Sequence, residues 1–218
     1  MSVVVACADF YRNENGQEKK TLYATQAQSE RVQNLRVEYW NEVKEVNPKD
    51  LIFIDETGMN TALTRSHARA PIGVRAYGYR PYRKGKNLTL IGAITLSGFL
   101  GGMTVDGGTD GSVFRTFVEK ILVPRLWPGA VVVMDNLSSH QVKGVQEMIE
   151  ATGAKVIYLA PYSPDFNPIE NYWSKLKEYL RSWVSYNRDT IEQGISNAID
   201  LISIKDIKNW FTHCCYFR

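Results

Sequence analysis

The sequence predicts an α/β fold in which a five-stranded mixed sheet is flanked by helices. Two short apolar runs rich in β-branched residues, 51–54 and 130–134, each stop at an aspartate, and both are typical of buried strands. A turn signal at Ser97-Gly98 lies between two further β-rich runs and indicates a hairpin. Helical periodicities occupy much of the remaining chain.

The residues before the first strand are predicted to add one helix. Residues 1–20 are broken by Asn and Gly and are interpreted as an irregular lead-in. A helical segment follows over 21–50, in which apolar residues share one face from about Ser29 to Val46 and Asn47-Pro48 ends the helix. We expect this helix only to pack against the core.

The core is predicted to span residues 51–182. The hairpin joins runs 88–96 and 99–105, and a helix with apolar residues from Phe114 to Leu122 stops at Pro124. The strand 130–134, a helix around 142–149, a strand over 156–159 and a helix from Pro168 follow. The order strand, hairpin, helix, strand, helix, strand, helix is that of an RNase H-like core.

Two further helices are expected over residues 183–218 and are predicted to pack on the core. Asp189 and Glu192 have the spacing of a capping box at the start of the first one. Isoleucines at 191, 195, 199 and 202 give that helix an apolar face, and a last short helix covers about 204–211.

Three carboxylates are predicted to converge. Asp55 and Asp135 end the two buried strands, so if these strands are neighbours their side chains emerge together at the edge where open α/β sheets bind ligands. Glu170 can join them, because Asn167 suits the N-cap and Pro168 the first position of its helix. Taken alone, Glu170 could merely complete a capping box with Asn167. Clustered carboxylates repel one another, so without metal at least one should have a raised pKa, and a divalent cation is the simplest remedy.

Three sequence blocks carry a resemblance to a known family. They are residues 54–58 (IDETG), 134–140 (MDNLSSH) and 158–173 (YLAPYSPDFNPIENYW). They resemble the catalytic blocks of bacterial IS630-type transposases, which belong to the Tc1/mariner superfamily of DDE transposases. Their order and spacing are also those of the family, with 34 residues between Asp135 and Glu170. The similarity extends from about Lys20 to the C-terminus.

The resemblance implies an RNase H-like DDE domain that cleaves DNA and transfers strands in cut-and-paste transposition, with integration at TA dinucleotides. Asp55, Asp135 and Glu170 would be its catalytic residues and would hold two Mg²⁺ (or Mn²⁺) ions roughly 3.5–4 Å apart. Two alternatives stay open. One is an RNase H-like nuclease without strand transfer, and the other is a catalytically silent DNA-binding protein derived from a transposase.

Three further residues are expected to support the carboxylates from the second layer of the site. They are Asn136, His140 and Asn167. His140 could be a metal ligand or a proton shuttle, but it could equally cap or orient the helix that follows.

The segment after the first strand is basic and free of acids, since residues 57–105 contain no Asp or Glu. Its candidate DNA-binding residues are Arg65, Arg69, Arg75, Arg80, Arg83, Lys84 and Lys86, and Lys175 lies on the helix after Glu170. Guanidinium groups bind phosphates bidentately and the tyrosines between them can stack on bases, so we favour a DNA or partner contact over a solvated loop. The resemblance implies a loop here that clamps the partner subunit, so DNA and protein contact remain alternatives.

The composition permits a nucleic-acid partner without requiring one, because the net charge is only +3 and the pI about 8.7. The resemblance implies double-stranded DNA as partner, both element ends and target, and a homodimer assembled on it.

No targeting signal or membrane span is recognised, so a cytoplasmic bacterial protein, nucleoid-associated when bound to DNA, is expected. Only about twenty residues precede the resemblance, so the N-terminal helix-turn-helix region of full-length relatives is predicted to be missing, by truncation or by a split gene joined through frameshifting.

Overall fold

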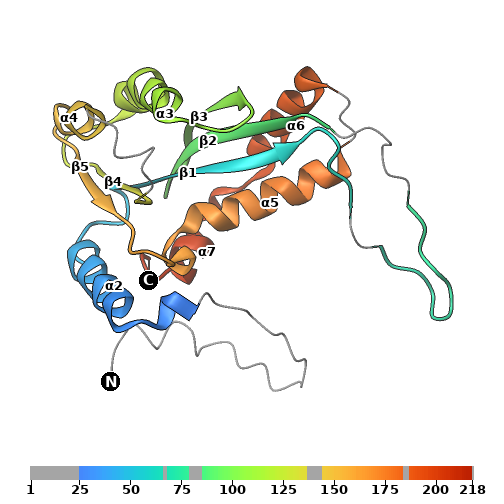
Figure 1. Ribbon diagram of the computed structural model, residues 1–218, viewed down its shortest axis with the longest axis horizontal. Helices are drawn as coiled ribbons and strands as arrows, with labels where there is room; N and C mark the ends of the chain where they lie inside the picture. Colours follow the sequence, from blue (N-terminus) through green and yellow to red (C-terminus); the bar gives the residue numbers. More distant parts are fainter. Residues whose placement is uncertain (1–24, 66–67, 79–84, 137–143, 184–186, 218) are drawn as a thin grey trace.

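The computed structural model describes residues 25–65, 68–78, 85–136, 144–183 and 187–217 (Figure 1). Its strands form one sheet in the order β3-β2-β1-β4-β5. The strands are β1 (Leu51–Asn60), β2 (Asn87–Thr95), β3 (Gly98–Asp106), β4 (Val131–Met134) and β5 (Lys155–Tyr158). β1 pairs antiparallel with β2 and β2 with β3, whereas β4 lies parallel to β1 and β5 parallel to β4. The predicted five-stranded mixed sheet is therefore confirmed.

Helices cover both faces of this sheet (Figure 1). The α-helices are α2 (Glu30–Val43), α3 (Gly111–Phe117), α4 (Val145–Glu150), α5 (Pro168–Ser182), α6 (Arg188–Leu201) and α7 (Ile204–His213). Short helical turns are η1 (Thr25–Gln28), η2 (Val118–Leu122), η3 (Val123–Arg125) and η4 (Pro164–Phe166). α3 and α4 share one apolar cluster with the sheet, and α5, α6 and α7 share the other. This arrangement is the RNase H-like fold that the order of elements predicts.

Alternation along β1 decides which face carries each of its side chains. Ile52 and Ile54 belong to the cluster shared with α3 and α4, whereas Leu51 and Phe53 belong to the cluster shared with α5. Because successive side chains of a strand point to opposite faces, Asp55 continues the row of Leu51 and Phe53. The carboxylate of Asp55 therefore lies on the α5 face.

β4 follows the same rule. Its residue Val133 lies in the α5-side cluster and pairs with Phe53 of β1 in parallel register. Asp135 comes two residues after Val133, just beyond the last residue of β4. Since Asp55 likewise comes two residues after Phe53, the two aspartates reach the same edge on the same face, as the sequence predicts.

The predicted end of one helix is wrong. The helix expected from Phe114 to Pro124 is α-helical only as far as Phe117, and it continues through the π-helical turn η2 and the 3-10 turn η3. In η2 the N–H of Val123 bonds to the carbonyl of Val118, five residues earlier. Proline has no N–H to donate, so the backbone changes its hydrogen-bond spacing before Pro124 and passes through it instead of stopping there.

The predicted capping box of α6 is also wrong, because the helix starts two residues earlier. Asn187 is the N-cap, and its side chain accepts a hydrogen bond from the N–H of Thr190 at 2.9 Å. Asp189 lies inside the first turn. Glu192 instead accepts a hydrogen bond from the hydroxyl of Thr104 at 2.6 Å, so it joins α6 to β3.

The N-terminal helix α2 begins directly after Ser29, as predicted, and ends at Val43 rather than Val46. Its face toward the core includes the buried Tyr39 and, unexpectedly, the buried Arg36. Within the ranges that the structure describes, no helix has both the length and the apolar character needed to span a membrane.

Candidate active site

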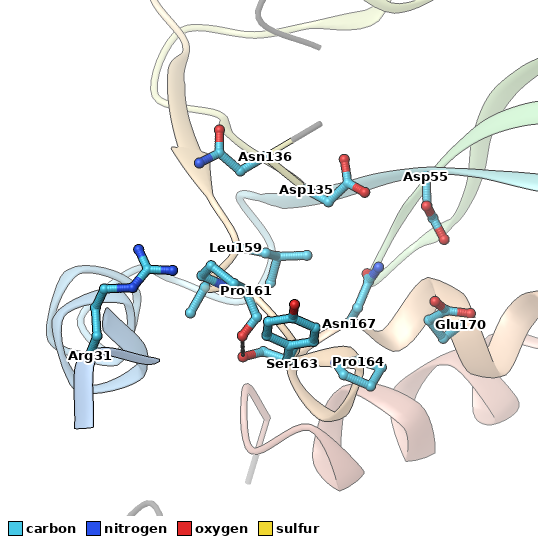
Figure 2. Close-up of a pocket in the computed structure, with 12 residues that line it drawn as sticks. Arg31, Asp55, Asp135, Asn136, Leu159, Pro161, Ser163, Pro164, Asn167 and Glu170 are labelled. Carbon is cyan, nitrogen blue, oxygen red and sulfur yellow. Dashed lines mark hydrogen bonds between the residues drawn. The ribbon is translucent and has the colours of Figure 1, made fainter. Parts of the chain in front are cut away.

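A cavity of about 470 Å³ lies where the two aspartate-bearing strands meet the start of α5. Its lining includes Asp55, Asp135 and Glu170. Figure 2 shows the carboxylates of Asp55 and Glu170 turned toward each other, with Asp135 beside them. The three predicted catalytic side chains thus share one cavity, although they come from β1, from the end of β4 and from the first turn of α5.

The side chain of Asp55 is fixed by α5. The indole N–H of Trp173 donates a hydrogen bond to its Oδ2 at 3.1 Å. Trp173 can come this close because Gly92, which pairs with Asp55 across β1 and β2, has no side chain. A Cβ at position 92 would lie 2.7 Å from Cη2 of Trp173 and 3.0 Å from the ring of Phe99.

Sequence reasoning missed Gly92 and Trp173 as residues of the site. Trp173 has a second role as a core residue of α5, in which its side chain is only 2% exposed. A signal was present at Gly92, because a glycine inside a buried strand often marks a close approach by another group.

The carboxyl of Asp55 is harder to ionise than usual. Its burial, then the negative charge of Glu170 and more weakly that of Asp135, raise its pKa from 3.8 to about 7. The predicted raised pKa is therefore confirmed, but burial is the larger cause and like-charge repulsion the second. A cation that enters the cavity would stabilise the ionised form of this carboxyl group.

Asn167 does not cap α5 with its side chain. It occupies the N-cap position, yet the side chain makes no capping hydrogen bond, and the backbone N–H of Glu170 instead bonds to the Asn167 carbonyl at 3.1 Å. The capping-box alternative for Glu170 is therefore wrong, and Glu170 stays exposed at the cavity. The side chain of Asn167 is only 5% exposed, and its Oδ1 accepts no hydrogen bond from the described residues.

The loop that leads to Glu170 is held by a buried arginine of α2. Arg36 donates to both carboxylate oxygens of Asp165, at 2.9 and 2.6 Å, and to the hydroxyl of Ser163 at 2.7 Å. Its guanidinium also lies over the ring of Phe166, 4.3 Å from the centroid. A planar cation with this many fixed partners holds the loop in one geometry. α2 therefore does more than pack against the core, contrary to the expectation from sequence.

Two tyrosines hold the same loop from another side. The hydroxyl of Tyr216 donates to the Phe166 carbonyl at 2.6 Å, and it lies 2.5 Å from the hydroxyl of Tyr39. Tyr39 also stacks on the Phe166 ring, with centroids 5.5 Å apart. Segments before and after the three carboxylates in sequence thus fix the loop that leads to Glu170.

We expect a large coupling free energy between the side chains of Arg36 and Asp165. Arg36→Met should lower the free energy of unfolding by about 2–3 kcal/mol, because Ser163 and Asp165 lose their donor and a half-exposed carboxylate stays behind. Urea unfolding of both single variants and of the double variant with Asp165→Asn measures the coupling, which should exceed about 1 kcal/mol.

A matched control joins the same helix to β5. Lys155 and Glu42 form an ion pair at 2.8 Å, but both side chains are about half exposed, so their coupling should stay below about 0.5 kcal/mol. Equal coupling in the two pairs would contradict a special role for Arg36.

The described members of the predicted DNA-binding set lie apart from the cavity. Of the basic segment, Arg65, Arg69, Arg75 and Lys86 are exposed, whereas Arg80, Arg83 and Lys84 lie outside the described residues, as does His140. Lys175 forms an ion pair with Asp206 at 2.7 Å, and the lysine and Ser203 lower the pKa of Asp206 to about 2. None of the described members of the set lines the cavity. The basic residue that does line it is Arg31, which sequence reasoning missed.

The three carboxylates line the same cavity, but they are too far apart to bind one metal ion together. Within the described ranges, no three His, Cys, Asp or Glu side chains come close enough together to hold a metal ion between them. Repulsion between the like charges opposes a closer approach of the three carboxylates. Asn136, next to Asp135, is exposed and also lines the cavity.

The class of protein follows from the sequence match over this region. The profile of the family described as DDE superfamily endonuclease matches residues 50–192, which include all three carboxylates. The chain therefore belongs to the DDE superfamily endonucleases. A comparison with curated proteins gives no match.

Solved structures narrow the fold to that of a mariner transposase. A pre-cleavage Mos1 transpososome is 16% identical, with a TM-score of 0.70 over 93% of this chain and 67% of that chain. The mariner Mos1 paired-end complex with Mg is 15% identical, with a TM-score of 0.72 over 97% and 69%. The catalytic domain of Mos1 mariner transposase alone is 14% identical, with a TM-score of 0.59 over 91% and 92%. At such identities the likeness establishes the fold, which is the RNase H-like fold of these transposases.

Proposed function

We propose that this chain is the catalytic domain of an IS630-type DDE transposase, which cleaves DNA and transfers strands in cut-and-paste transposition. The observation that carries the proposal is the convergence of Asp55, Asp135 and Glu170 on one cavity, with the pKa of Asp55 raised by burial and by its neighbours. Acids held in such an arrangement are a mark of a functional site. Membership of an endonuclease family supports the same reaction class.

The donor set fits hard divalent cations. Carboxylate and amide oxygens are the ligands that Mg²⁺ and Mn²⁺ prefer, and Asp55, Asp135 and Glu170 would hold two such ions. The buried Oδ1 of Asn167, which accepts no hydrogen bond from the described residues, would add a neutral oxygen to this set. When bound, divalent ions would stabilise charge on the phosphate oxygens and activate the attacking oxygen.

The protein's own contribution is positioning. The N–H of Trp173 fixes one oxygen of Asp55, and Arg36 fixes the loop that carries Glu170. In cleavage, a water oxygen forms the new bond to phosphorus and the 3′-oxygen of the cut strand leaves. In strand transfer, the oxygen of the freed 3′-hydroxyl forms the new bond to a phosphorus of target DNA, and the 3′-oxygen of the target strand leaves. Neither reaction needs a covalent intermediate with the protein, so fixed geometry is what these residues add to the stabilisation of charge.

The side chains exposed on the segment after β1 favour two kinds of contact, one with a second copy of the chain and one with DNA. Its exposed part carries the large apolar side chains of Ile72, Val74 and Tyr77. Exposed apolar residues in a long excursion from the domain, visible in Figure 1 beyond the tip of β1, favour contact with protein. The arginines on either side favour contact with phosphates. We propose a homodimer assembled on double-stranded element ends and target, acting in the cytoplasm.

The reaction is tested with two substrates. The wild-type chain should cleave or nick supercoiled plasmid in millimolar Mg²⁺ or Mn²⁺ and lose this activity in EDTA. It should also join a pre-cleaved duplex bearing a 3′-hydroxyl to plasmid DNA. Cleavage without joining would favour a nuclease of the same fold, and absence of both activities at every metal concentration would overturn the proposal.

A further inference from the structure

The cavity extends well beyond the three carboxylates. Its lining also includes Arg31 of α2, Asn136, Pro161 and Tyr162. Figure 2 shows Arg31 on the opposite side of the cavity from Asp55 and Glu170, with Pro161 between them. A volume of about 470 Å³ lies in the range of cavities that hold an organic ligand. The divalent ions proposed above would fill only the end of the cavity at the carboxylates.

Tyr162 is displayed in an unusual way. Its φ of 56° lies in the left-handed region, which is uncommon for a bulky residue, and 51% of its surface is exposed. The following residues Ser163 and Asp165 are fixed by Arg36, so the conformation belongs to a rigid loop. Backbone strain that presents an aromatic ring at the rim of a candidate active site points to a function for that ring.

Arg31, unlike Arg36, has no carboxylate partner among the described residues. It lies in the first turn of α2, is exposed, and forms no ion pair with the described residues. A cation is unfavourable in the first helical turn, where the helix dipole is positive. An anion bound between Arg31 and the rest of the cavity wall would offset this unfavourable interaction.

We propose that this end of the cavity is a subsite for one unpaired DNA nucleotide adjacent to the phosphate that reacts at the carboxylates. The base stacks on Tyr162, and the next phosphate along the strand pairs with Arg31. The cavity has carboxylates on one side and Arg31 on the opposite side (Figure 2), and the exposed ring of Tyr162 also lines it. These are the groups that a reacting phosphate, a base and the next phosphate of a single strand would need. The base must be unpaired, because a ring can stack on it only when its face is open. The inference rests on the proposed function for the identity of the strand.

Fluorescence binding assays test the subsite without any chemistry. The probe is a DNA duplex with a short single-stranded end that contains one 2-aminopurine, and it is titrated with wild-type protein in EDTA. Stacking on Tyr162 should quench the 2-aminopurine, and Tyr162→Ala should lose this quenching and weaken binding about 5- to 100-fold. Tyr162→Phe should retain both. A blunt duplex of the same sequence should bind both proteins equally.

Arg31→Gln should weaken binding of the same probe and lower its salt dependence by about one ion. Arg181→Gln is the matched control, since Arg181 is an exposed helical arginine of α5 that does not line the cavity. Unchanged quenching in Tyr162→Ala, or equal losses for the blunt duplex, would overturn the subsite. Failure of the transposase proposal is recognised separately, by absence of metal-dependent cleavage in a protein that still binds and quenches the probe.

Discussion

Asp135→Asn is expected to lower the rate of metal-dependent DNA cleavage by at least about 10³-fold. The change keeps the shape of the side chain but removes the negative charge that would hold a divalent cation at the end of β4, and charge stabilisation is the main means of catalysis in phosphoryl transfer. The rate of plasmid cleavage in Mg²⁺, measured with and without the substitution at equal protein concentration, gives the effect directly.

Two controls separate this loss from damage to the fold. Asp200→Asn removes an exposed carboxylate of α6 outside the cavity and should leave the cleavage rate within about twofold. Thermal melts of Asp135→Asn without metal should match or exceed those of the wild type, because one source of repulsion on Asp55 is gone. A variant that keeps more than a tenth of the activity would argue that Asp135 does not hold the metal.

The second large effect concerns pH and the metal-free fold. Because the folded-state pKa of Asp55 is about 7 and its ordinary value is 3.8, the folded protein holds this proton more tightly than the unfolded chain does. The contribution of Asp55 to stability is therefore complete below pH 4 and is lost as pH rises through 7. The loss should amount to about 2–4 kcal/mol between pH 4 and pH 8.

Asp55→Asn isolates this contribution from other titrating groups. Urea denaturation measures the difference in unfolding free energy between wild type and variant. This difference should change by about 2–4 kcal/mol between pH 4 and pH 8, in favour of the variant at pH 8. Millimolar Mg²⁺ or Mn²⁺ at pH 8 should stabilise the wild type and have little effect on the variant. A pH-independent difference would show that Asp55 is not held in a repulsive, buried setting.

The placement of the carboxylates could be predicted because it depends on local rules. A buried strand with a fixed alternation determines the face on which Asp55 and Asp135 emerge, and the first turn of a helix after Asn167-Pro168 determines where Glu170 stands. These rules need no knowledge of distant contacts. The matching order of strands in the sheet then brings the three together.

The residues that hold the carboxylates could not be predicted in the same way. Arg36 meets Asp165 across 129 positions of sequence, and Trp173 meets Asp55 across 118. An amphipathic pattern assigns such residues to a buried or exposed face but does not identify their partners. Arg36 even contradicts the pattern, since a charged side chain occupies the buried face of α2.

The start of α6 was mispredicted for a related reason. Asn187 and Asp189 are both good N-cap residues two positions apart, so local chemistry alone cannot choose between them. Asn187 closes a capping box of its own with Thr190, and Glu192 is engaged by Thr104 of β3 and by Arg188 instead of by Asp189. A local box and a tertiary contact therefore both favour the earlier start.

The hydrogen bond from Tyr216 to the Phe166 carbonyl has a consequence for the synthesis of the protein. The two residues are 50 positions apart, so a ribosome adding about 5–20 residues per second makes the loop several seconds before the tyrosine that holds it. Throughout that interval the carboxylate of Glu170 lacks one of the supports of its loop. A nascent chain therefore gives this loop its full set of contacts only after α5, α6 and α7 have been made.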